Sequence, residues 1–192
     1  MSTFRKTGSR RAIATEVASL RWLAEAAADG GAAVAEPVWD SFGEYYAEGR
    51  LRPYVAMAPW LDADDAALLH HACDAVATGR FDSPQPALCG PVARIHGDLW
   101  GGNVVWTADG VGTLIDPCAN GGHAETDLAE LALFGSPHLA DTVAGYHEVS
   151  PLADGWPARV PLHQFHMLLV HVVLFRGGYV RQALAVAREL LR

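Results

Sequence analysis

The stretch Arg94–Trp106, RIHGDLWGGNVVW, brings together residues that an ordinary turn would not need. An acid, Asp98, follows a histidine and a glycine, and Asn103 comes shortly after it. Only a leucine, a tryptophan and two glycines separate the acid from the asparagine, and a short apolar run follows. The pattern indicates a loop that holds Asp98 and Asn103 for a chemical purpose and then enters a strand.

A β-hairpin is predicted directly after this loop, in VVWTADGVGTLID. Asp109-Gly110 is the strongest two-residue hairpin signal, and a turn at this pair places Asn103 opposite Asp116. Directly opposed residues have Cα atoms roughly 4.5–5.5 Å apart, so we expect the two side chains to share a small divalent cation. Both offer oxygen ligands, which suits Mg²⁺. A bulge at Gly112 would shift this register.

Asp98 lies next to the predicted metal pair but is not needed to hold the ion. An acid in that place can accept the proton of an attacking hydroxyl while the metal neutralises phosphate charge, which is phosphotransferase chemistry. The spacing of His96, Asp98 and Asn103 is that of the kinase catalytic loop, H-x-D-x-x-x-x-N. Asp98 is therefore the predicted catalytic base, and Asn103 and Asp116 are the predicted metal ligands.

A lysine near the N-terminus is a candidate for binding phosphate. Lys6 is the only lysine among the 14 basic residues of the chain, and its ammonium group is a compact point charge where arginine offers a planar fork. Lys6 lies in a predicted strand, and Glu16 on the following predicted helix can pair with it. Chance placement of a lone lysine is an equally weighted alternative.

The segments HGDLWGGN, LIDP and GGHAETDLAELALFG resemble the fructosamine kinase (ketosamine kinase) family, within the wider aminoglycoside phosphotransferase-like and protein-kinase-like fold. FRKTG followed by ATEVASLRWL resembles that family's lysine strand and glutamate helix. The resemblance implies an α+β, protein-kinase-like fold and an enzyme that uses ATP and Mg²⁺. Its implied reaction phosphorylates a sugar hydroxyl of a small or protein-bound ketoamine. By resemblance, Asp98 is the base, Asn103 and Asp116 bind the metal, and Lys6 with Glu16 binds the nucleotide phosphates.

The N-terminal lobe is expected to be shortened. Residues 1–40 hold the lysine strand and the glutamate helix, but they leave too little room for the adenine-binding hinge. Residues 41–192 are expected to form a mainly helical C-terminal lobe that carries the catalytic hairpin. Two alternatives to a kinase stay open: a non-catalytic kinase-like remnant that acts as a binding module, and a metal-dependent phosphohydrolase. The missing hinge favours the remnant, whereas the complete set of Asp98, Asn103 and Asp116 favours an active kinase.

Composition argues against several classes of partner. The 192 residues carry a net charge of −8 and an isoelectric point of about 5.5, which disfavours non-specific binding to nucleic acid or to an anionic membrane. The longest apolar run, Met167–Phe175, is interrupted by His171 and is too short to span a bilayer. Three cysteines without metal or disulfide spacing, and no signal-peptide pattern, predict a cytoplasmic protein. No oligomeric state is predicted.

Helices are predicted from apolar periodicity and from end signals. Asp62 is the predicted N-cap of one helix, and the D-x-x-E pattern of Asp127 and Glu130 is interpreted as the cap of another. The predicted helices after residue 40 span Phe42–Leu51, Asp62–Thr78, residues 127–135, Pro161–Arg176 and Tyr179–Leu191, and another short helix is predicted to start at Ser136-Pro137.

Several other side chains have two interpretations. The ring of Trp100 either packs against the substrate or pins the catalytic loop, and both interpretations carry equal weight. His123, Glu125 and Asp127 follow the metal-binding acid, where the resembled family closes its site. His123 and Glu125 are candidate substrate contacts, whereas capping a helix is favoured over a site role for Asp127. Three histidines in the late apolar helix are expected to be core or rim residues rather than metal ligands: His163, His166 and His171.

Overall fold

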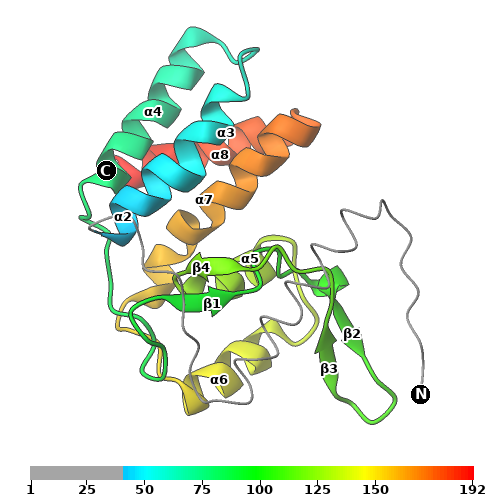
Figure 1. Cartoon of the computed structure of the whole chain (residues 1–192). Coiled ribbons are helices and arrows are strands. Elements are labelled where there is room, and N and C mark those ends of the chain that lie inside the picture. The colour runs from blue at the N-terminus through cyan, green and yellow to red at the C-terminus, as the bar shows by residue number, and fades with distance from the viewer. Residues whose placement is uncertain (1–40) are drawn as a thin grey trace. The chain divides into compact units, whose positions relative to one another are not determined.

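The computed structural model describes residues 41–192, which fall into two compact units (Figure 1). The first unit contains residues 85–151 and carries all the strands that the described residues form. The second contains residues 41–84 together with 152–192, and its regular structure is entirely helical. The predicted lysine strand and glutamate helix, and the lobe boundary at residue 40, lie outside or at the edge of the described residues and stay predictions.

Two short antiparallel ladders organise the first unit. β1 (Ala93–Ile95) pairs with β4 (Asn120–Gly122), and β2 (Val104–Trp106) pairs with β3 (Gly112–Leu114). A 3-10 turn, η2 (Gly101–Asn103), leads into β2. Two helices follow β4 and contact each other: α5 (Glu125–Leu133) and α6 (Leu139–Val149). The alternating apolar residues of β1 face inward, because Ala93 and Ile95 are both buried.

The second unit is built around α7 (Trp156–Phe175). This helix contacts α8, α3 and the π-helical turn η1, while α4 packs against α8 and η1. The bounds of these elements, with the short α2 that starts the unit, are Phe42–Tyr45 for α2, Tyr46–Leu51 for η1, Arg52–Ala56 for α3, Ala63–Ala77 for α4 and Gly178–Leu190 for α8. α7 ends at Phe175 and α8 begins at Gly178, so the chain breaks between the two helices close to where the predicted ranges leave a gap.

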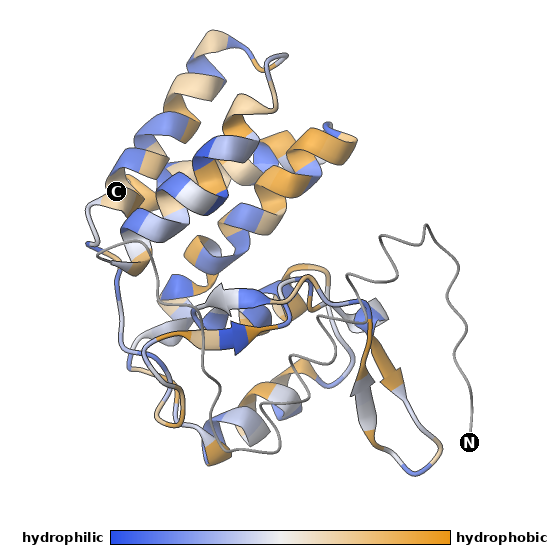
Figure 2. Cartoon of the chain, in the orientation of Figure 1, coloured by the Kyte–Doolittle hydropathy of each residue, from blue (hydrophilic) through white to orange (hydrophobic). Residues whose placement is uncertain are grey.

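α7 is the most apolar long helix that the structure describes. By length and composition alone it is the one helix in residues 41–192 that could cross a membrane, and Figure 2 shows hydrophobic residues along much of it. However, eight of its side chains are buried, and it packs against η1, α3 and α8. A helix that is apolar on most sides is also typical of the core of a helical unit, and the contacts of α7 place it in that role.

Two helix boundaries were predicted correctly, the start of α4 and the break between α7 and α8. Asp62 caps α4 as predicted, with its carboxylate accepting the amide N–H of Asp65 at 2.8 Å. The prediction that a helix ends before Pro53 was wrong, because the helical path continues through η1 into α3. Pro53 lies in the first turn of α3, where the missing N–H is tolerated. α7 also begins earlier than predicted, at Trp156, with Pro161 inside it.

A buried tyrosine joins η1 to α7. The hydroxyl of Tyr46 lies 3.1 Å from the carbonyl oxygens of both Leu162 and His163, and it accepts the amide N–H of His166 at 3.2 Å. The ring of His166 lies edge-on to that of Tyr54, with centroids 5.0 Å apart. The Nε2 atom of His166 is buried without a hydrogen-bond partner among the described residues. His166 is therefore a core residue, as predicted.

We expect the second unit to lose stability on mild acidification because of His166. Burial, with a smaller effect from the charge of Arg50, lowers the pKa of this imidazole from 6.5 to about 3. A group whose pKa is depressed in the folded state takes up its proton preferentially in the unfolded chain, so the free energy of unfolding falls as pH drops from about 6.5 towards about 3. The slope due to one such group is about 1.4 kcal/mol per pH unit.

Urea unfolding between these pH values would measure this slope. His166→Leu should reduce the pH dependence by about one proton, because the titrating group is gone. His70→Gln, on an exposed position of α4, is the matched control for the loss of a histidine. Equal slopes in the wild-type chain and in His166→Leu would show that His166 does not titrate in this way.

Candidate active site

The loop that carries Asp98 follows β1 and is anchored through buried His96. Its imidazole Nε2 donates to the carbonyl oxygen of Ile115 at 2.9 Å, and its own carbonyl oxygen accepts the amide N–H of Cys118 at 2.8 Å. Gly97 then turns the chain with φ +74°, a left-handed conformation that glycine adopts without steric cost. Together these contacts tie the loop to the segment that follows β3.

Two carboxylates of α5 accept the amide N–H groups of this loop. Asp127 accepts from His96 through Oδ2 at 2.7 Å and from Gly97 through Oδ1 at 2.9 Å. Glu130, which is buried, accepts from Leu99 through Oε2 at 3.1 Å. The prediction that Asp127 caps a helix was wrong, because α5 already begins at Glu125. The D-x-x-E spacing instead places two acids on one face of α5, turned towards the loop.

The surroundings of Asp127 raise the pKa of its carboxyl above the ordinary value. Burial raises the pKa of this carboxyl, the two backbone N–H bonds lower it, and the nearby charge of Asp98 raises it further, so the net shift is upward. The two N–H bonds stabilise the ionised form that the loop needs as an acceptor. The upward shift means that the effect of burial on this carboxyl outweighs that of its two hydrogen bonds.

The structure brings together Asp98 and Asn103, as the sequence predicted. The side-chain amide Nδ2 of Asn103 donates to the carbonyl oxygen of Asp98 at 2.8 Å and lies 3.2 Å from its carboxylate Oδ2. Asn103 is buried, whereas Asp98 is half-buried. The five-residue spacing is closed by the η2 turn, in which the amide N–H of Asn103 also donates to the carbonyl of Trp100 at 2.9 Å.

The predicted register of the hairpin was wrong by one residue. Val104 pairs with Leu114, and the amide N–H of Ile115 donates to the carbonyl of Asn103 at 3.0 Å, so Asn103 lies opposite Ile115 rather than Asp116. The shift arises because the turn has three residues instead of two: Thr107 bonds to Val111, and Gly110 adopts φ +82°. A three-residue loop that ends in a left-handed glycine is the next most common hairpin type.

Asp116 leaves the strand geometry directly after Ile115. It is exposed and has φ +61°, one of three positive-φ residues other than glycine among those described. Because Asp116 adopts this left-handed conformation, the alternation of side chains along a strand no longer determines to which side its carboxylate points. Such a conformation is uncommon outside glycine and tends to occur at functional sites. The pairing of Asp116 with Asn103 around a metal stays a prediction.

Trp100 packs onto the loop itself. A Cβ atom added to Gly102 would collide with the indole ring of Trp100, and the ring meets Phe134 edge-on with centroids 6.5 Å apart. These contacts support the interpretation that Trp100 holds the catalytic loop in place. The side chain nevertheless remains 43% exposed, and a contact with substrate stays a prediction.

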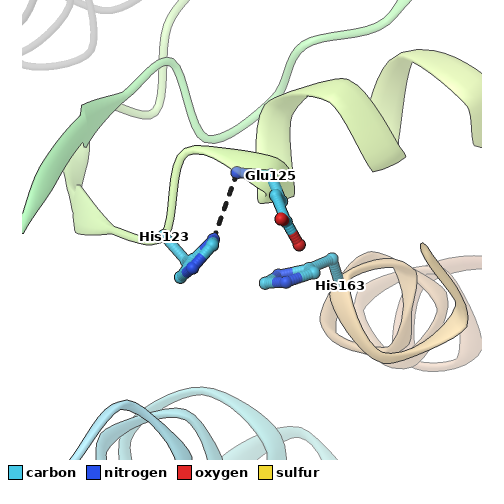
Figure 3. A group of neighbouring side chains, drawn as sticks. All are labelled: His123, Glu125 and His163. Carbon is cyan, nitrogen blue, oxygen red and sulfur yellow. Dashed lines mark hydrogen bonds between the residues drawn. The ribbon is translucent and has the colours of Figure 1, made fainter. Parts of the chain in front are cut away.

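His123 and Glu125 lie together where β4 passes into α5. Both are buried, and the amide N–H of Glu125 donates to Nδ1 of His123 at 3.3 Å (Figure 3). Their predicted contact with substrate stays a prediction. Lys6 and Glu16, the predicted nucleotide-phosphate pair, lie outside the described residues.

Asp127 and Glu130 are the residues of the loop site whose role was missed. The sequence signal was present, since two acids three apart on an otherwise apolar helix face need donors if they are buried. Their partners, however, are amides about thirty positions earlier, and no local pattern identifies such partners.

An aspartate hydrogen-bonded to an asparagine in one loop, followed by a hairpin and then a second aspartate, has the residue spacing of the kinase catalytic loop. A family model described as Fructosamine kinase matches residues 32–192. The chain therefore belongs to the fructosamine kinase family.

Individual relatives agree with this assignment. The chain is 34% identical over 158 residues to a probable ketoamine kinase of Synechocystis sp., which covers 81% of this chain and 50% of the relative. It is 33% identical over 150 residues to the ketosamine-3-kinase of Mus musculus, covering 77% of this chain and 46% of the relative. The chain thus spans about half the length of these relatives.

Solved structures show the same fold. A crystal structure of a candidate fructosamine-3-kinase from Thermobifida fusca matches with a TM-score of 0.71 and 47% identity, covering 80% of this chain and 52% of the other. A second, from Haemophilus somnus, matches with a TM-score of 0.64 at 19% identity, and this likeness concerns the fold alone. The mostly helical architecture with small hairpin sheets therefore matches the C-terminal portion of this family's fold.

Proposed function

We propose that this protein is an ATP- and Mg²⁺-dependent kinase that phosphorylates a sugar hydroxyl of a fructosamine or other ketoamine. The observation that carries the proposal is the hydrogen-bonded pair of Asp98 and Asn103 in a loop held by α5. Two carboxylates of α5, of which Glu130 is buried and Asp127 half-buried, support this loop, and removing such groups from water is costly unless they are used. Membership of the fructosamine kinase family supports the choice of substrate class.

Asp98 acts as the general base in this proposal. Its carboxylate accepts the proton of the substrate hydroxyl while the hydroxyl oxygen attacks the terminal phosphorus of ATP and the bond to the leaving ADP breaks. Asn103 orients the acid, because its Nδ2 contacts both the carbonyl and the carboxylate of Asp98. Trp100, beside the base and partly exposed, offers an apolar plane at the mouth of the site.

The residues present fit a magnesium ion. The amide nitrogen of Asn103 is engaged by Asp98, which leaves its Oδ1 as the atom that can bind a cation. Asp116 supplies a carboxylate shortly after the strand partner of Asn103, and a carboxylate and an amide oxygen are ligands that Mg²⁺ accepts. When bound, the ion neutralises charge on the transferred phosphoryl group. Lys6, held by Glu16, is proposed to contact the nucleotide phosphates.

Loss of the metal ligands should be visible in the magnesium dependence of turnover. Asp116→Ala should reduce turnover to background, because the only proposed charged ligand is removed. Asn103→Ala should raise the Mg²⁺ concentration for half-maximal turnover by on the order of 10-fold. Asp109→Ala, at the exposed tip of the same hairpin, is the matched control and should behave like the wild-type chain. An unaltered Mg²⁺ titration in Asp116→Ala would remove Asp116 from the site.

A binding module without catalysis is the second candidate, because the segment between the predicted glutamate helix and Phe42 is short for an adenine-binding hinge. ADP release from ATP and Mg²⁺, with and without a fructosyl-lysine derivative, separates the candidates. The kinase requires ADP release that depends on the ketoamine. Release without ketoamine would indicate a phosphohydrolase, and calorimetric binding of the ketoamine without any release would indicate the binding module.

A further inference from the structure

Two peptide groups, one on each side of the Gly97–Asp98 peptide, are fixed by hydrogen bonds. In each of them both the carbonyl oxygen and the N–H have a partner. In the His96–Gly97 peptide, the carbonyl accepts from Cys118 at 2.8 Å and the N–H donates to Asp127 at 2.9 Å. In the Asp98–Leu99 peptide, the carbonyl accepts from Asn103 at 2.8 Å and the N–H donates to Glu130 at 3.1 Å. Because each residue has only two soft backbone dihedrals, holding these two groups restricts the direction of the Cα–Cβ bond of Asp98.

The two holds differ in what they depend on. The first uses the backbone N–H of Cys118 and the side chain of Asp127, whereas the second uses two side chains, those of Asn103 and Glu130. Glu130 is 1% exposed and lies three residues after Asp127, on the same side of α5. A bond from an amide N–H to a carboxylate is stronger than one to a neutral acceptor. The orientation of the peptide that directly follows Asp98 therefore rests on Glu130 together with Asn103.

We propose that Glu130 is a positioning residue that sets the direction of Asp98 by holding the Leu99 amide. As far as catalysis is concerned, this inference rests on the proposed kinase function. Without the carboxylate of Glu130, the Asp98–Leu99 peptide is held at its carbonyl alone and can rotate about it. The base then moves relative to the substrate hydroxyl, and a displacement of about 1 Å can lower a rate by on the order of 100-fold.

Two substitutions of Glu130 distinguish the effect of losing the hydrogen-bond acceptor from the effect of changing the side-chain volume. Glu130→Met keeps an unbranched, helix-favouring chain of similar length but removes the acceptor. Glu130→Gln keeps a carbonyl oxygen in nearly the same place. Asp141→Ala, an exposed acid on α6 in the same unit, is the control for the loss of a carboxylate. Retained helicity by circular dichroism establishes that each variant is folded.

The first measurement is hydrogen exchange at single amides by NMR. In Glu130→Met, the Leu99 amide should exchange about tenfold faster, since its hydrogen bond is lost, while the amides of β1 and β4 should keep their wild-type rates. Glu130→Gln should restore most of the Leu99 protection. Unchanged exchange at Leu99 in Glu130→Met would overturn the proposal. Faster exchange spread over the whole unit would also overturn it, because Glu130 would then only stabilise the unit.

The second measurement is steady-state kinetics with ATP and a fructosyl-lysine derivative. Glu130→Met should lower kcat by about 10- to 100-fold with KM unchanged for both substrates, and Glu130→Gln should recover most of the loss. Wild-type kcat despite faster Leu99 exchange would refute the positioning role. If the wild-type chain shows no turnover, the proposed kinase function fails, whereas the exchange result at Leu99 still decides whether Glu130 holds the loop.

Discussion

Asp98→Asn should lower phosphoryl transfer to the ketoamine by about 10²–10⁴-fold, the range expected when a general base is lost. Asparagine keeps the size of the side chain and an oxygen that can accept from Nδ2 of Asn103, which lies 3.2 Å from Oδ2 of Asp98. The loop should therefore keep its shape while losing its proton acceptor. KM for ATP should change little, because Asp98 is proposed to act on the hydroxyl rather than on the nucleotide.

Steady-state kinetics and thermal unfolding, measured together, test this expectation. The matched control is Asp141→Asn, which makes the same chemical change at an exposed position of α6. A turnover for Asp98→Asn within a few-fold of wild type would exclude Asp98 as the base. A fall in turnover accompanied by unfolding would mean that Asp98 supports the loop rather than the reaction.

The parts of the site that were predictable are those with local signals. The spacing of Asp98 and Asn103 identified a loop in which the two side chains are hydrogen-bonded, because a short glycine-containing segment can close only in a few ways. The hairpin itself was also predictable from Asp109-Gly110. Its register was not, since an Asp-Gly pair suits both a two-residue turn and a three-residue loop with glycine in the left-handed conformation. The structure has the latter, with Gly110 at φ +82°.

The parts that were missed depend on contacts between distant residues. Asp127 was interpreted as a helix cap because acids near helix starts usually act locally. Its true partners, the amides of His96 and Gly97, come about thirty residues earlier in the chain. Tyr46 is a similar case, since its hydroxyl contacts carbonyls of α7 more than a hundred residues later. Helix periodicity reports which face is buried, but it does not identify the atoms that the face meets.

Gly97→Ala should disrupt the catalytic loop. Among the described glycines of the first unit that have positive φ, we expect alanine to have its largest effect on the loop at this position. The residue has φ +74°, which costs about 1–2 kcal/mol for any residue with a Cβ. The added Cβ would also lie 2.5 Å from the carbonyl oxygen of Cys118 and 2.6 Å from Nδ2 of Asn120. The Cys118 atom belongs to backbone that is hydrogen-bonded to His96, so it cannot move away without breaking the anchor of the loop.

Gly110→Ala isolates the steric part of this effect. Gly110 has a similar conformation, φ +82°, but at the hairpin tip no atom lies within 4 Å of the place that the added methyl group would take. Both substitutions therefore carry the same conformational cost, and Gly97→Ala should exceed Gly110→Ala by about 1–3 kcal/mol, the usual cost of overpacking. Hydrogen exchange of the β1 and β4 amides measures the free energy of opening in each variant. Because Gly97 directly precedes Asp98, turnover should fall with the loop in Gly97→Ala and stay near wild type in Gly110→Ala. Equal effects of the two substitutions on opening would show that the contact with Cys118 does not constrain the loop.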